Sequence, residues 1–88
     1  MIKRDANEAE IVKALRRIGC SVQLLHGNTQ GTPDLLVGRN GRNYLLEVKG
    51  RKGKLEPSQV AWHGSWRGEV HVVRTEEDAL RAVGLMAA

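Results

Sequence analysis

Apolar positions concentrate in the middle of the chain, in two runs on either side of Asn40-Gly41. The runs extend from Asp34 to Gly38 and from Asn43 to Lys49. Asn-Gly between two such runs predicts a type I′ turn, because both central residues of that turn need positive φ. A two-residue turn fixes the register with Arg39 opposite Arg42. The pattern therefore predicts a β-hairpin.

In this register Asp34 faces Glu47 across the hairpin, and Val37 faces Tyr44. Side chains alternate between the faces of a strand, so Lys49 lies on the same side as the two carboxylates. Directly opposed carboxylates repel each other, since their Cβ atoms would be only about 5 Å apart. The arrangement therefore predicts a cation between Asp34 and Glu47, which makes this end of the hairpin a candidate metal site with a lysine beside it.

A purely structural explanation is that Asp34 is a turn residue after Pro33, and that Glu47 and Lys49 lie on a solvated edge of the sheet. The apolar pattern argues against this, because both faces of the hairpin carry large apolar residues: Leu36 and Leu45 on one, and Leu35, Val37, Tyr44, Leu46 and Val48 on the other. A carboxylate at the end of a buried hairpin is costly unless it is paired. We therefore favour the metal site.

The remaining pattern predicts one helix before the hairpin and two after it. Asp5 is the expected N-cap of the first helix, with Glu8 completing a capping box. Ile11, Val12, Leu15 and Ile18 form its buried stripe. Glu8 continues this stripe by one turn, whereas Glu10 points away beside Lys13 and Ala14. Glu8 is thus either a solvated cap residue or a third carboxylate near the hairpin.

The second helix is expected from Pro57 to a stop at Gly68. Its Val60 and Ala61 are predicted to pack inward, and Trp62 and Trp66 to fill the core rather than stack on bases. His63 is interpreted as a surface histidine or a phosphate contact. Strands are expected at Ser21 to His26 and Glu69 to Arg74, and a Thr75–Asp78 capping box predicts a short C-terminal helix. The predicted order is α-β-β-β-α-β-α.

Length and composition place limits on the class of protein. The 88 residues predict one domain, 1–88, whose small core would gain from a second copy of the chain, so we expect a homodimer. Cys20 is the single cysteine, which excludes an intrachain disulfide and a cysteine-based zinc site. No apolar run approaches the length of a membrane span, and the N-terminus lacks the pattern of a signal peptide. A cytoplasmic protein, bacterial or phage-encoded, is expected.

The net charge of +4 favours a polyanionic partner. Basic residues gather in the loop after the carboxylate-bearing strand and just before the first helix. The candidate DNA-binding residues are Lys3, Arg4, Arg51, Lys52, Lys54 and His63. A run of charges is often just a solvated loop, but this one adjoins the candidate site.

The chain carries an ordered set of motifs. Pro33-Asp34 is followed by a hairpin and then by Glu47-Val48-Lys49-Gly50. The helix after these residues carries Gln59 and Trp62, and the first helix carries a glutamate. This set resembles the virus-type replication-repair nuclease (VRR-NUC) domain of the PD-(D/E)XK nuclease superfamily over about residues 7 to 74. The resemblance implies an α/β fold: an αβββαβ core with a four-stranded mixed sheet flanked by helices, here with a short extra C-terminal helix.

The resemblance also implies a metal-dependent DNA endonuclease that acts in replication, repair or recombination. Asp34, Glu47 and the carbonyl of Val48 would hold Mg²⁺ or Mn²⁺, with support from Glu8. Lys49 would activate the attacking water, and Gln59 would position Lys49 or the phosphate. The first alternative is a non-catalytic nucleic-acid-binding module, although carboxylates facing phosphates would not help a pure binder. The second is a nuclease subunit that works only with partners such as a helicase or another replication protein.

Overall fold

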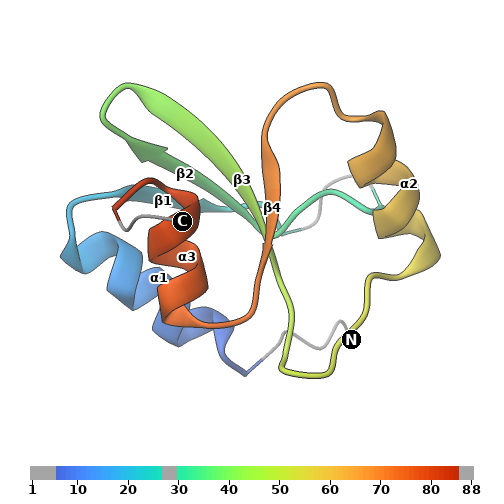
Figure 1. The fold of residues 1–88 in the computed structure, drawn as a ribbon, viewed down its shortest axis with the longest axis horizontal. Helices are drawn as coiled ribbons and strands as arrows, with labels where there is room; N and C mark the ends of the chain where they lie inside the picture. The colour runs from blue at the N-terminus through green and yellow to red at the C-terminus, as the bar shows by residue number, and fades with distance from the viewer. Residues whose placement is uncertain (1–5, 27–29, 86–88) are drawn as a thin grey trace.

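The computed structural model describes residues 6–26 and 30–85. Seven elements follow one another in the predicted order (Figure 1). They are α1 (Glu8–Arg17), β1 (Ser21–Leu24), β2 (Leu35–Arg39), β3 (Arg42–Val48), α2 (Pro57–Ser65), β4 (Val70–Val73) and α3 (Glu76–Ala82). The predicted α/β class and element order are therefore confirmed.

The four strands form one mixed sheet in the order β1-β2-β3-β4. The first two pairings are antiparallel and β3 pairs with β4 in parallel. Helices α1 and α3 lie side by side, whereas α2 lies apart from them (Figure 1). None of the described helices is long and apolar enough to cross a membrane.

The central hairpin has the predicted register. Arg39 pairs with Arg42, and Val37 pairs with Tyr44. Asn40 and Gly41 have φ values of 50° and 80°, which is the positive-φ pair that a type I′ turn requires. The strand that carries Glu47 is therefore fixed relative to Asp34 by local sequence alone.

The core lies between the sheet and the α1–α3 pair. It contains the hairpin residues Leu35, Val37, Tyr44, Leu46 and Val48 together with Ile11, Val12 and Leu15 of α1, Cys20, Val73, and Ala79 and Val83 from the C-terminal region. The predicted inward face of α1 is thus confirmed for its first three apolar residues, and Ile18 is partly buried. Ala14, which we expected on the outer face, is buried because α3 packs against α1.

The first helix begins later than the sequence predicts. Its N-cap is Asn7, and the predicted cap, Asp5, lies outside the described residues. The Asn7 side chain does not cap the helix. Instead its Nδ2 donates to the carbonyl oxygens of Lys49, at 3.1 Å, and Arg74, at 2.7 Å. This amide ties the start of α1 to the ends of β3 and β4.

Helix α2 differs most from the prediction. It ends at Ser65, before Gly68, and Val60 and Ala61 are exposed rather than packed inward. Trp66 is 47% exposed and stacks on the partly buried Trp62, with ring centroids 4.6 Å apart. The prediction that the tryptophans fill the core was wrong, because none of the residues of α2 is fully buried.

A glycine outside α2 explains how closely the chain can pack against this helix. At Gly31 the chain passes so close to α2 that an added Cβ would lie 2.4 Å from the carbonyl oxygen of Ser58. Gly31 also has a φ of +91°, a backbone conformation that residues other than glycine rarely adopt. The partly buried residues of α2 are Ser58, Gln59, Trp62 and His63, and these share one face of the helix.

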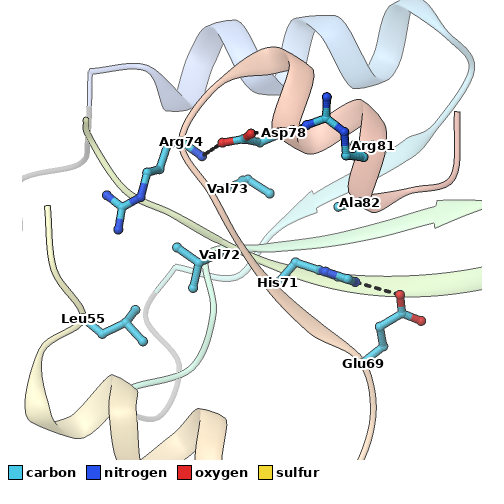
Figure 2. Close-up of a pocket in the computed structure, with 9 residues that line it drawn as sticks. All are labelled: Leu55, Glu69, His71, Val72, Val73, Arg74, Asp78, Arg81 and Ala82. Carbon is cyan, nitrogen blue, oxygen red and sulfur yellow. Dashed lines mark hydrogen bonds and ion pairs between the residues drawn. The ribbon is translucent and has the colours of Figure 1, made fainter. Parts of the chain in front are cut away.

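The C-terminal capping box is confirmed. The Asp78 amide donates to the Thr75 hydroxyl at 3.0 Å, and the Thr75 amide donates to Oδ2 of Asp78 at 3.2 Å. The same carboxylate oxygen accepts the Arg74 amide at 2.9 Å (Figure 2). This network fixes the backbone of Arg74 where β4 leads into α3.

Candidate active site

The carboxylates of Asp34 and Glu47 belong to one end of the hairpin. Asp34 directly precedes β2, and its carbonyl accepts the Leu25 amide at 2.8 Å. Its Oδ2 reaches across to β3 and accepts the Val48 amide at 2.8 Å. Glu47, the neighbour of Val48 in β3, is 1% exposed. The structure therefore brings the two predicted carboxylates together around the backbone at Glu47 and Val48.

Lys49 directly follows β3, and its backbone is held on both sides. Its amide donates to the Val73 carbonyl at 3.0 Å, and its own carbonyl accepts the Asn7 amide described above. Alternation along the strand puts its side chain on the face of Glu47. The backbone that carries the Glu47-Val48-Lys49 motif is therefore rigid, which favours a site whose groups keep fixed positions.

Gln59 contacts Glu47 rather than Lys49. Its Oε1 accepts the backbone N–H of Glu56 at 2.7 Å, at the start of α2. Because the amide oxygen is used in this way, the NH₂ end must point to the other side. There Nε2 donates to Oε2 of Glu47 at 3.1 Å. The structure thus adds a contact with Glu47, and the predicted contact of Gln59 with Lys49 or a phosphate stays a prediction.

His63 is neither a surface histidine nor turned outward. Its side chain is only 14% exposed, and Nε2 lies 3.7 Å from Oε1 of Glu47. Burial and then the charge of Lys49 lower the pKa of His63. No local pattern connects His63 with Glu47, because the two residues lie on different elements.

Glu8 lies on the buried side of α1, as the apolar stripe predicts, and Glu10 is exposed. Glu8 is 8% exposed, and its Oε2 lies 3.3 Å from Nε2 of His26. His26 did not stand out in the sequence, since it follows the first strand with no motif around it. Its partner Glu8 is 18 positions earlier, so no local spacing could reveal the pair.

The fit to a metal ion depends on the kind of ligand. Among residues 6–26 and 30–85 no three or more His, Cys, Asp or Glu side chains form a group that could hold a metal. A site on Asp34 and Glu47 would therefore use two carboxylates, a backbone carbonyl and water. All of these are oxygen ligands, which suit Mg²⁺ or Mn²⁺, and Mg²⁺ in particular keeps several waters when it binds to proteins.

The basic residues Arg51, Lys52 and Lys54 are exposed in the loop that follows Lys49. The Arg74 guanidinium pins this loop, because Nη1 donates to the carbonyls of Gly50 and Gly53 at 2.7 Å each. The loop therefore presents its cations from a fixed backbone that directly follows the Glu47-Val48-Lys49 motif. The two other basic candidates, Lys3 and Arg4, lie outside the described residues.

Two cavities among the described residues lie away from the carboxylates. One of about 730 Å³ lies along β4 and α3 and is lined by residues such as His71, Arg74 and Arg81 (Figure 2). Another, of about 590 Å³, is lined by Leu36 and Leu45 together with the two tryptophans of α2. Neither lining includes Asp34 or Glu47.

The fold matches a solved structure described as a VRR_NUC domain, with a TM-score of 0.67. The two chains are 26% identical, and the match covers 90% of this chain and 96% of the other. No protein-family model matches the sequence. No curated protein matches it significantly.

Proposed function

Because this chain has the fold of a VRR-NUC domain, which is a nuclease fold of the PD-(D/E)XK superfamily, we propose that it is a Mg²⁺- or Mn²⁺-dependent DNA endonuclease. The observation that carries the proposal is the buried Glu47, held by Gln59, next to an Asp34 bound to the Val48 amide. Glu47 is buried and Asp34 is part-buried, and a divalent cation bound between them would offset the cost of placing carboxylates away from water.

Asp34 and Glu47 would be the metal ligands, with the carbonyl of Val48 as a third. Glu8, on the buried side of α1, would support the metal through a water molecule. When bound, the metal would polarise the phosphate and lower the pKa of a bound water. The contribution of the chain itself is to hold the ligands in place, through the Asp34–Val48 and Gln59–Glu47 hydrogen bonds.

Lys49 would orient the attacking water or take its proton, and its charge would offset the negative charge that develops on the phosphate. The two backbone hydrogen bonds of Lys49, to Val73 and Asn7, support this role because they fix where the side chain starts. Arg51, Lys52 and Lys54 would bind phosphates on either side of the cleavage point without reading bases.

The enzyme would be structure-selective and act in the replication, repair or recombination of a phage or mobile element, in the cytoplasm of a bacterial or phage-infected cell. The test is incubation with a panel of linear, nicked, flapped and junction DNAs in Mg²⁺, in Mn²⁺ and in EDTA. The proposal expects cleavage of at least one branched or nicked DNA with metal, and none in EDTA. Binding without cleavage of any substrate would favour the non-catalytic module instead.

A further inference from the structure

Helix α2 presents two side chains to the same carboxylate. Gln59 and His63 are four residues apart, so they lie on one face of the helix. Gln59 Nε2 donates to Oε2 of Glu47 at 3.1 Å, and His63 Nε2 lies 3.7 Å from Oε1. Each oxygen of Glu47 therefore has one side chain of α2 beside it.

One ring nitrogen of His63 is buried, which is costly for a polar atom. Nε2 is buried and has no hydrogen-bond partner within the described part of the chain. A buried nitrogen of this kind lowers stability unless it forms a hydrogen bond. The ring also packs edge-on against Trp62, with centroids 6.1 Å apart, which limits where it can turn. Glu47 is the group that its Nε2 faces.

We propose that His63 is a positioning residue that acts with Gln59 to fix the Glu47 carboxylate in one orientation when a divalent cation binds. This rests on the proposed function. A separation of 3.7 Å is too long for a hydrogen bond, but a shift of about 1 Å would make one. Contacts in catalytic sites are often long in the free enzyme and shorten in the working complex.

The proposal assigns a definite protonation state to the ring. To donate to Glu47, the neutral imidazole must carry its proton on Nε2, with Nδ1 unprotonated. A direct bond from Nε2 to the metal would require the opposite tautomer, because the metal would take the Nε2 lone pair. Mg²⁺ prefers oxygen ligands, which favours the positioning role over direct ligation.

The first test is a calorimetric titration of the full chain with Mn²⁺ or Mg²⁺ in the absence of DNA. His63→Leu keeps the volume but removes the donor, and His63→Gln restores an N–H donor. We expect His63→Leu to weaken metal binding by about 10- to 100-fold, as is typical for partners of metal ligands, and His63→Gln to recover most of that loss. The matched control is His71→Leu. His71 lies on β4 and its ring contacts Glu69 instead of Glu47, so this substitution should leave metal affinity unchanged.

Melting temperatures of the metal-free variants separate positioning from a purely structural role. Without metal, we expect the melting temperature of His63→Leu to be no lower than that of the unsubstituted protein. On metal addition, the melting temperature of His63→Leu should rise by less. Metal affinity of His63→Leu within twofold of the unsubstituted protein would overturn the proposal. If the unsubstituted protein binds neither metal, the proposed function falls as well, so the two failures give different results.

Nitrogen NMR of the Mg²⁺-loaded protein gives an independent readout. The proposal expects the His63 ring to carry its proton on Nε2 and that proton to exchange slowly with water. An unprotonated Nε2 in the Mg²⁺-loaded state would overturn the positioning role, because the ring could then not donate to Glu47.

Discussion

At the scale of single residues, the side chains at the start of α1 contact partners far away in the sequence. Asn7 reaches carbonyls 42 and 67 positions away, and Glu8 meets His26. Residue type and helical periodicity were enough to place Glu8 inward and Glu10 outward. They could not identify these partners, because no local spacing records a contact that only the folded sheet creates.

The distinction between Glu8 and Glu10 gives a residue-scale prediction. Glu8→Gln should weaken metal-dependent cleavage strongly, because the buried carboxylate loses its charge while its amide can still meet His26. Glu10→Gln should leave cleavage nearly intact, since Glu10 is exposed on the same helix. Metal titrations of the cleavage rate compare the two variants directly. The opposite ranking would mean that the carboxylate supporting the metal is on the other side of α1.

At the scale of elements, the hairpin was predictable and α2 was not. The hairpin register follows from Asn40-Gly41 and from alternation, both of which are local. The facing of α2 depends instead on Gly31, which lies far from the helix in sequence and lets the chain approach Ser58. The Trp62–Trp66 spacing does not by itself show that both rings lie outside the core, stacked on each other.

Gly31 therefore provides a prediction about α2. Gly31→Ala should destabilise the protein by about 1–3 kcal/mol, because it combines a backbone clash with a strained positive φ. Gly64→Ala is the matched control, since Gly64 lies within α2 with open space around it and should gain up to about 1 kcal/mol. Urea unfolding followed by tryptophan fluorescence measures both, as the two tryptophans belong to or adjoin α2. Equal free energies of unfolding for Gly31→Ala and Gly64→Ala would contradict the conclusion that Gly31 allows the chain to pack closely against α2.

The basic loop gives a second element-scale prediction. Replacing Arg51, Lys52 and Lys54 with alanine should lower the slope of log affinity against log salt by up to about one unit per residue. Arg17→Ala is the control, because Arg17 is an exposed cation at the far end of α1 from Glu8. Filter-binding or anisotropy titrations at several salt concentrations provide the slopes. An unchanged slope in the triple variant would remove the loop from the DNA-binding surface.

At the scale of the whole molecule, the core lies on one side of the sheet. The large apolar side chains left exposed include Val60 and Trp66 in and after α2 and Val72 in β4. Val72 pairs with Glu47 and so belongs to the face opposite the core. The topology and the one-sided core follow from the order of elements, but the sequence alone does not show how much apolar surface this second face exposes.

A small core and this exposed surface predict a homodimer. Light scattering should give the mass of a dimer at micromolar concentration. Val72→Asp should shift the protein towards monomer, whereas Leu24→Asp should not, because the exposed Leu24 pairs with Leu35 and belongs to the core-side face. A stable monomer of the unsubstituted protein at that concentration would contradict the prediction.

The central claim is that Asp34 and Glu47 form a metal-dependent cleavage site with Lys49, and the most direct measurement combines activity with stability. Asp34→Asn and Glu47→Gln each keep an oxygen acceptor for the Val48 amide and for Gln59, so both should fold normally. Without metal they should be as stable as the unsubstituted protein or more stable, because like-charge repulsion is relieved.

The account predicts that Mg²⁺- or Mn²⁺-dependent DNA cleavage is abolished in both carboxylate variants and reduced about 10²- to 10⁴-fold in Lys49→Ala. Cleavage that persists in excess EDTA, or full activity in both Asp34→Asn and Glu47→Gln, would contradict it.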